Sequence, residues 1–129
     1  MRIPARLRRL VRQRAGARCE YCLLPEELAF QEHEPDHVIA VQHEGKTEAS
    51  NLALACFLCN RHKGPNIGSF DPSTGKLTSF FNPRKDVWSE HFEWDGPIIR
   101  PLTPEGRVTV KIFRFNDPDR VEERRTATP

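Results

Sequence analysis

Four cysteines in two C-x-x-C pairs are the feature that most constrains how this chain folds. Cys19 and Cys22 form the first pair, and Cys56 and Cys59 form the second. A gap of two residues lets both thiolates of a pair face one tetrahedral ion, so two such pairs are typical of a structural zinc site. A closed site with four sulfur ligands stabilises a fold and leaves no position open for chemistry.

Two disulfides or a redox-active pair are the alternatives for these cysteines. The segment "MRIPARLRRL" has the charge of a signal-peptide start but no apolar stretch after it, which disfavours structural disulfides. A thioredoxin-like site needs one pair on a βαβ unit rather than two similar pairs. No apolar run approaches the ~18 residues that a membrane span requires. We therefore expect a cytoplasmic protein with no membrane partner.

Charge is distributed unevenly, although the net charge is only +2. Residues 1–18 hold seven arginines and no acid, whereas residues 19–45 hold seven acids and no Lys or Arg. Such a basic segment suits a nucleic-acid partner, and an acidic one suits a cation. A solvated basic helix beside a solvated loop explains the same pattern, and charge alone does not separate the two interpretations.

The first half of the chain predicts a helix followed by a ββα unit. Residues 4–16 have apolar positions at helical spacing, with a proline for the first turn and a glycine for the stop. Residues 28–41 indicate two short strands broken near Pro35, and residues 42–50 a polar loop. Residues 51–64 are apolar and then basic, and favour a helix over their second half.

The second half predicts three strands and a helix. Residues 76–83, 88–94 and 97–102 are expected as strands. Residues 103–116 begin with Thr-Pro, which is typical of a capped helix start, although alternation of period two also fits them.

A chain of 129 residues has the size of one domain. We expect an α+β fold in which a zinc-stabilised ββα core carries a β-rich and helical extension. The boundaries predicted are 1–68 for the arginine-rich helix and the core and 69–129 for the extension, both within one domain.

The motifs between the cysteine pairs resemble the HNH endonuclease family, in its cysteine-bearing ββα-metal (His-Me finger) form. The resemblance covers about residues 15–68. It rests on four segments, which are Cys19-Glu20-Tyr21-Cys22, Asp36-His37-Val38-Ile39, Asn51-Leu52 and Cys56-Phe57-Leu58-Cys59-Asn60-Arg61-His62-Lys63-Gly64.

The resemblance implies hydrolysis of phosphodiester bonds with one divalent ion. It makes His37 the general base, and a neutral imidazole with a pKa of ~6.5 suits that role at neutral pH. It makes Asp36 and Asn60 the ligands of the ion, where many members have histidine in place of Asn60. Two oxygen ligands favour Mg²⁺ or Mn²⁺ over zinc. Asn51 is expected to hold the loop after the histidine and to keep its ring oriented.

The expected partner is DNA, held by its phosphate backbone. Arg8 and Arg12 on the first helix, together with Arg61 and Lys63, are the predicted phosphate contacts. His62 lies on another helical face from Asn60 and is expected outside the metal site.

Other histidines and the tryptophans are given structural roles. His33 and His43 are expected as exposed polar side chains, and His91 as a packed or hydrogen-bonded strand residue. Trp88 and Trp94 are expected in the core rather than as surfaces on which bases stack.

Two classes of function follow. The first is a metal-dependent DNA endonuclease that acts as a monomer or a weak homodimer. The alternative is a non-catalytic zinc module that binds nucleic acid or protein. A pure binding module needs the cysteines but has no need of Asp36, His37, Asn51 and Asn60 in this order, so the sequence favours the nuclease.

Overall fold

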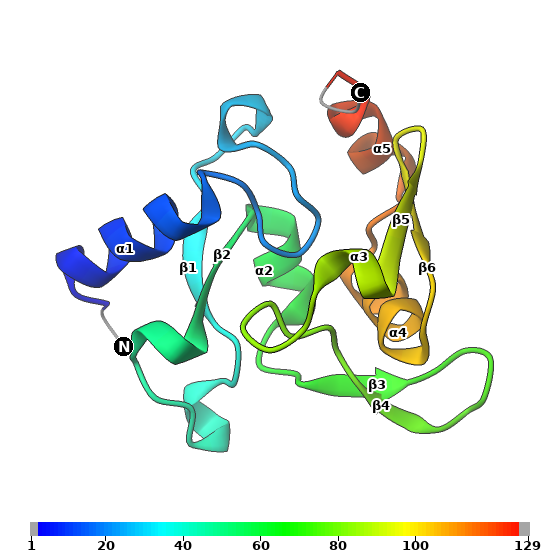
Figure 1. The fold of residues 1–129 in the computed structure, drawn as a ribbon, viewed down its shortest axis with the longest axis horizontal. Coiled ribbons are helices and arrows are strands. Elements are labelled where there is room, and N and C mark those ends of the chain that lie inside the picture. Colours follow the sequence, from blue (N-terminus) through cyan, green and yellow to red (C-terminus); the bar gives the residue numbers. More distant parts are fainter. Residues whose placement is uncertain (1–2, 127–129) are drawn as a thin grey trace.

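The computed structural model describes residues 3–126 and contains three separate two-stranded antiparallel sheets with helices packed against them (Figure 1). The order of the elements is α1 (Ala5–Ala15), β1 (Glu34–His37), β2 (Leu52–Ala55), α2 (Phe57–Lys63), β3 (Gly68–Phe70), β4 (Leu77–Ser79), α3 (Trp88–His91), β5 (Phe92–Asp95), β6 (Ile98–Pro101), α4 (Pro104–Phe113) and α5 (Pro118–Arg124). Short 3-10 turns cover Glu26–Leu28, Val41–His43 and Ala49–Asn51. This mixed α and β architecture confirms the expected fold class.

Helix α1 forms as its sequence predicts. Pro4 is the N-cap, and Gly16 ends the helix with φ 64°, a left-handed conformation in which a side chain would be strained. Val11 is buried against Leu52 and Leu54 of β2. The helix therefore lies across the first hairpin through a small apolar cluster.

The first hairpin differs from the two strands expected within residues 28–41. That segment contributes only β1, and its partner β2 comes from the apolar residues that follow the polar loop. Pro35 lies inside β1, opposite Leu54. A proline is tolerated there because each strand of a two-stranded ribbon has a free edge on which no N–H is needed.

Strand β2 is buried on both faces, which explains why its sequence does not alternate. Leu52 and Leu54 face α1, whereas Ala53 and Ala55 belong to the main core. A strand covered on both sides is a continuous apolar run, and such a run cannot be told from a helix by periodicity.

Helix α2 completes the ββα unit that the sequence predicts. Its N-cap is Cys56, whose sulfur accepts a hydrogen bond from the backbone N–H of Cys59. Helix α2 contacts both β1 and α4 (Figure 1).

The second half contains the strand predicted at 97–102, as β6, and a three-residue strand β4 within 76–83. The strand expected at 88–94 is partly wrong, because residues Trp88–His91 form one helical turn before β5 begins at Phe92. Strand β3 and helix α5 were not predicted.

Helix α4 is capped as expected, since the Thr103 side chain accepts a hydrogen bond from the Gly106 N–H and Pro104 stands at the first position. Its buried face contributes Val108 and Phe113 to the main core. That core is continuous with the cysteines and includes aromatic rings from the second half, which are Phe80, Phe81, Phe92, Phe113 and Phe115.

Candidate functional site: a four-cysteine cluster beside an Asp-His pair

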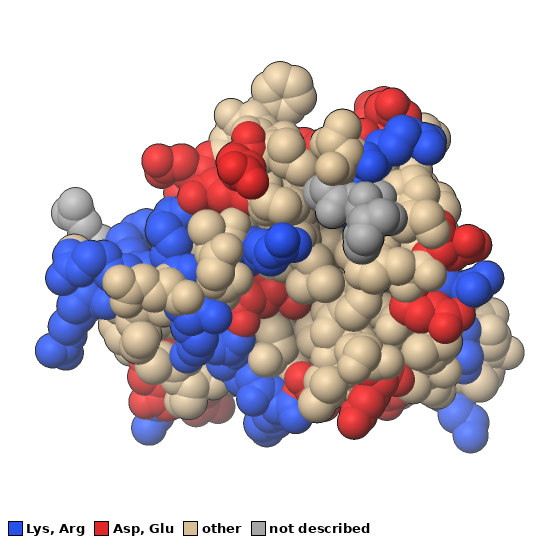
Figure 2. Space-filling model, turned by 45° about the horizontal axis from the view of Figure 1, so that its top comes forward, with Lys and Arg blue, Asp and Glu red and all other residues tan. Residues whose placement is uncertain are grey.

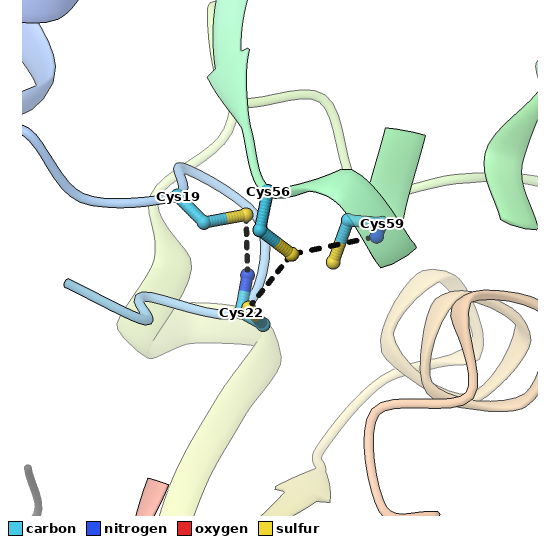
Figure 3. A group of neighbouring side chains, drawn as sticks. All are labelled: Cys19, Cys22, Cys56 and Cys59. Carbon is cyan, nitrogen blue, oxygen red and sulfur yellow. Dashed lines mark hydrogen bonds between the residues drawn. The ribbon is translucent and has the colours of Figure 1, made fainter. Parts of the chain in front are cut away.

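The two C-x-x-C pairs meet at one point in the structure. Cys19 and Cys22 lie on the loop after α1, and Cys56 and Cys59 lie at the junction of β2 and α2 (Figure 3). All four side chains are buried, and their sulfur atoms lie within 4.8 Å of one another. In each pair a backbone N–H donates to the first sulfur, Cys22 to Cys19 at 3.5 Å and Cys59 to Cys56 at 3.4 Å.

This cluster fits a tetrahedral zinc ion. Zinc takes four thiolates at about 2.3 Å each, which places neighbouring sulfurs about 4 Å apart. The four cysteines are free rather than paired in disulfides. The structure therefore supports the structural zinc site that the spacing predicts, and it removes the disulfide alternative.

A buried arginine adjoins the sulfur atoms. The guanidinium of Arg120, on α5, donates to Cys59 Sγ at 3.0 Å and to Cys56 Sγ at 3.4 Å, and its side chain is only 3% exposed. Burial acts to lower the pKa of Arg120, but the charge of the neighbouring thiolates outweighs it and the pKa is raised. Arg120 thus provides positive charge beside four thiolates, whose total charge exceeds that of a zinc ion.

The Asp-His pair lies at the end of β1. Asp36 points inward, and its Oδ2 accepts a hydrogen bond from the Tyr21 hydroxyl at 3.0 Å and an ion pair from Lys63 Nζ at 3.2 Å. Asp36 is 8% exposed and Lys63 is 2% exposed. Burial raises the pKa of the Asp36 carboxyl, and the adjacent ammonium of Lys63 opposes this only in part.

Lys63 therefore does not fit the phosphate contact expected from the sequence. Its ammonium also donates to the backbone oxygen of His37 at 3.0 Å, so it points into the protein toward β1. Helical spacing indicated correctly that Lys63 shares a face with Asn60. That face is turned toward the hairpin rather than toward solvent.

His37 is the last residue of β1 and is half-buried. Its Nε2 lies 2.9 Å from the hydroxyl of Thr47 in the loop before β2. Partial burial lowers the pKa of His37, although the Asp36 carboxylate opposes the change. The neutral imidazole is therefore favoured at neutral pH, and within residues 3–126 no hydrogen bond occupies its Nδ1.

Asn51 makes the hydrogen bonds that hold the loop between the strands. Its side chain accepts from the Ile39 N–H and donates to the backbone oxygens of Ile39 and Lys46, each at 2.9 Å. Gly45 is required there, because a Cβ would lie 1.7 Å from the Ile39 oxygen. The loop that carries Thr47 is thereby fixed beside His37, while a catalytic part for Asn51 stays a prediction.

Asn60 and Arg61 lie in the middle of α2. The Asn60 side chain is half-buried and makes no hydrogen bond with the described residues, so its amide oxygen is free to take a ligand. Arg61 is exposed, and its guanidinium lies 6.0 Å from the centre of the Phe57 ring.

Two of the arginines predicted to bind phosphate are engaged within the protein. Arg12 pairs with Glu26 and donates to the His33 backbone oxygen, and Arg8 pairs with Glu34 at 3.2 Å. The ion pair of Arg8 with Glu34 is exposed, so a phosphate could take the place of Glu34. The ion pair of Arg12 with Glu26 is partly buried. The described structure has five exposed arginines without an ion pair, which are Arg6, Arg9, Arg14, Arg18 and Arg61. Of these, Arg14 donates to the backbone oxygens of Ala49 and Leu52.

The remaining histidines separate into buried and exposed. His33 is only 1% exposed and bonds the Leu24 backbone oxygen at 2.8 Å, so its expected exposure is wrong. His43 is exposed as expected. His91 forms a hydrogen bond of 2.6 Å with the Thr103 hydroxyl, as predicted. It lies on a helical turn, however, rather than on the predicted strand.

The tryptophans pack within the protein, as expected. Trp88 lies 5.5 Å from Trp94 between ring centres and donates its indole N–H to the Tyr21 backbone oxygen.

Three residues of the site were missed from the sequence. Tyr21 is the chain's one tyrosine and stands inside the first cysteine pair, which could have marked it. Arg120 follows Asp117-Pro118, a typical helix start that could have predicted α5. Thr47 carries no signal, since its role depends on how the loop is folded.

The ββα unit thus carries four buried cysteines that could hold one metal ion. Residues 19–66 of the chain match the family model described as HNH endonuclease. Its clustered cysteines are consistent with the zinc-bearing branch of the family. A search of curated proteins and a search of solved structures gave no match. Among the described residues no helix is long and apolar enough to cross a membrane.

Proposed function

We propose that the protein is a divalent-metal-dependent DNA endonuclease. The observation that carries the proposal is the placement of Asp36 and His37 at the end of β1, packed against the helix that holds Asn60, within the segment that matches the HNH family. The zinc-tied ββα unit gives these side chains a fixed scaffold. Hydrolysis of a phosphodiester requires an activated water and compensation of charge on the phosphate and the leaving oxygen.

His37 acts as the general base in this proposal. Its lowered pKa keeps the ring neutral at physiological pH. When Nε2–H donates to the Thr47 hydroxyl, the lone pair on Nδ1 is available to take the proton of a water. Thr47 and the Asn51 hydrogen bonds hold the ring and its loop in position.

Asp36 and Asn60 would hold the catalytic ion. A carboxylate and an amide oxygen are ligands of the kind that Mg²⁺ and Mn²⁺ prefer. Both contacts of Asp36 within the described residues go to Oδ2, which leaves Oδ1 for the ion. The bound ion would supply charge stabilisation to the phosphate and the leaving oxygen.

Phosphate contacts are assigned to the exposed arginines rather than to Lys63 and Arg12. Figure 2 shows Lys and Arg side chains gathered over the part of the surface formed by α1. Arg6, Arg9 and Arg18 supply charge there. Contacts of this kind bind the DNA backbone without reading its sequence, and they weaken with salt.

One observation favours the non-catalytic alternative. The Asp36 carboxylate is already neutralised by Lys63, as in a purely structural ion pair. In that case the domain would bind nucleic acid or protein through α1 and cleave nothing. The two functions are separated by the following experiment.

Supercoiled plasmid is incubated with zinc-loaded protein and Mg²⁺ or Mn²⁺, and nicked product is measured on gels. The His37→Ala variant should be slower by about 10²–10⁴-fold, the usual contribution of a general base. His43→Ala, which removes an exposed histidine from the neighbouring loop, is the control and should cleave at the normal rate. Equal cleavage rates for wild type and His37→Ala would refute the assignment of His37 as the general base.

Three further statements stay predictions. The division at residue 68 into a core and an extension of one domain is one of them. A cytoplasmic location and a state between monomer and weak homodimer are the others.

A further inference from the structure

The carboxylate of Asp36 is held by two donors that act on the same oxygen. The Tyr21 hydroxyl donates to Oδ2 at 3.0 Å, and Lys63 Nζ lies 3.2 Å from it. No hydrogen bond to Oδ1 is present within residues 3–126. The carboxylate is therefore fixed in one rotation, with one oxygen engaged and the other left open.

Each of the two donors lies on a segment that carries one of the cysteine pairs. Tyr21 stands between Cys19 and Cys22, and Lys63 ends the helix whose first turn contains Cys59. The sulfur cluster joins both segments at one point (Figure 3). A single zinc ion on the four sulfurs would thus determine the distance between the hydroxyl and the ammonium.

Both donors are themselves immobile. The Tyr21 side chain is fully buried, its ring lies 5.1 Å from that of Phe113, and its backbone oxygen accepts the Trp88 indole N–H at 2.8 Å. Lys63 is held by a second hydrogen bond to the backbone oxygen of His37. A long side chain normally loses conformational entropy when it binds a partner. The side chains of Tyr21 and Lys63 are already held in one conformation by the fold.

We propose that the zinc cluster is the positioning device of the catalytic carboxylate: Tyr21 and Lys63 hold Asp36 Oδ2, so that Oδ1 faces the divalent ion. The inference rests on the proposed function, because it assigns the ion to Asp36. Tyr21 and Lys63 are positioning residues that act through Asp36. The cysteines thereby contribute to the reaction as well as to folding.

The first test measures Mn²⁺ affinity of the zinc-loaded chain by the electron paramagnetic resonance signal of free Mn²⁺. Tyr21→Phe removes the hydroxyl and keeps the ring on Phe113. We expect its Kd for Mn²⁺ to rise about tenfold, as is usual when a group that orients a metal ligand is lost. Zinc content and the far-UV circular dichroism spectrum should stay at wild-type values.

The control is Thr109→Val, which removes another fully buried hydroxyl. Thr109 bonds the Glu105 oxygen and the Phe81 N–H, both away from Asp36. This variant should lose stability but keep the wild-type Kd for Mn²⁺. If Tyr21→Phe and Thr109→Val both bind Mn²⁺ within twofold of wild type, the proposal is overturned.

The second test does not depend on the divalent ion. Urea midpoints are measured for Tyr21→Phe, Asp36→Asn and the double variant, and the same set is made with Lys63→Met. Non-additive shifts are expected, because each donor acts on Asp36. Additive shifts in both sets would overturn the positioning role.

The two tests also separate this inference from the proposed function. If Asp36→Asn binds Mn²⁺ as tightly as wild type, the proposed ion site fails, and with it the claim that Oδ1 faces the ion. If only Tyr21→Phe keeps the wild-type Kd while Asp36→Asn loses affinity, the ion site stands and the positioning inference fails.

Discussion

Replacement of Arg120 by methionine tests whether its guanidinium helps the four cysteines to bind zinc. The variant keeps most of the side-chain volume but removes the guanidinium that donates to two sulfur atoms, at 3.0 and 3.4 Å. It also removes a hydrogen bond to the backbone oxygen of Phe113 at 2.5 Å. The buried cluster would then lose the positive charge that compensates its thiolates.

The magnitude follows from these contacts. A hydrogen bond to a charged group contributes about 1.5–3 kcal/mol, and loss of a group that supports metal ligands lowers affinity about 10–100-fold. We therefore expect the zinc Kd of Arg120→Met to rise about 10–100-fold, which equals roughly 1.4–2.7 kcal/mol.

The assay is competition for zinc with a chromogenic chelator at neutral pH. Arg124→Met is the matched control, because Arg124 is equally buried on the same helix but donates to the backbone oxygens of Pro97 and Phe115 rather than to sulfur. That variant should be destabilised and yet hold zinc more tightly than Arg120→Met. Zinc affinities of Arg120→Met and wild type within twofold of each other would refute the reasoning.

Two further predictions concern pH and salt. The guanidinium of Arg107 donates to both carboxylate oxygens of Asp71 and holds the pKa of that carboxyl well below its usual range. The ion pair therefore stabilises the fold above pH ~4, and this contribution is lost as the pH falls further. The urea midpoint of Asp71→Asn should thus lie below that of wild type at pH 7, and the gap should narrow below pH ~4; a constant gap would contradict the ion pair. For the double variant Arg6→Gln/Arg9→Gln, the slope of log affinity for DNA against log salt should become shallower by roughly 1.8, and an unchanged slope would show that α1 does not contact phosphate.

Local sequence signals were sufficient to predict the ends of helices that have clear capping residues. Gly16 ends α1, and Thr103-Pro104 begins α4, because these residues act within one turn of their own position. The strand within 88–94 was partly wrong because positions 88, 92 and 94 also fit a period of two, whereas the structure has one helical turn at Trp88–His91, which brings the Trp88 ring to 5.1 Å from that of Phe92. Alternation alone does not separate the two.

The pairing of the first hairpin was beyond local signals. The partner of β1 is 15 residues further along the chain, after a loop held by Asn51. The choice of β2 over a nearer strand depends on burial of Leu52 and Leu54 under α1, which is a contact between distant segments. The same reason applies to Lys63, whose position on the helix was predicted and whose burial was not.

The sequence by itself determined that the four cysteines can share one metal ion, that the core has ββα order and that residues 19–66 match the HNH family model. Spacing along the chain is enough for each of these, because it places two thiolates on one ion and it defines a motif. Only the tertiary structure decided which basic side chains are paired within the protein and which are left to bind a partner. Arg12, Lys63 and Arg120 look alike as basic residues in a sequence, yet one pairs with Glu26, one with Asp36 and one with sulfur. The physical reason is that a charge is neutralised by whatever the fold brings within about 4 Å of it, and those neighbours come from distant parts of the chain.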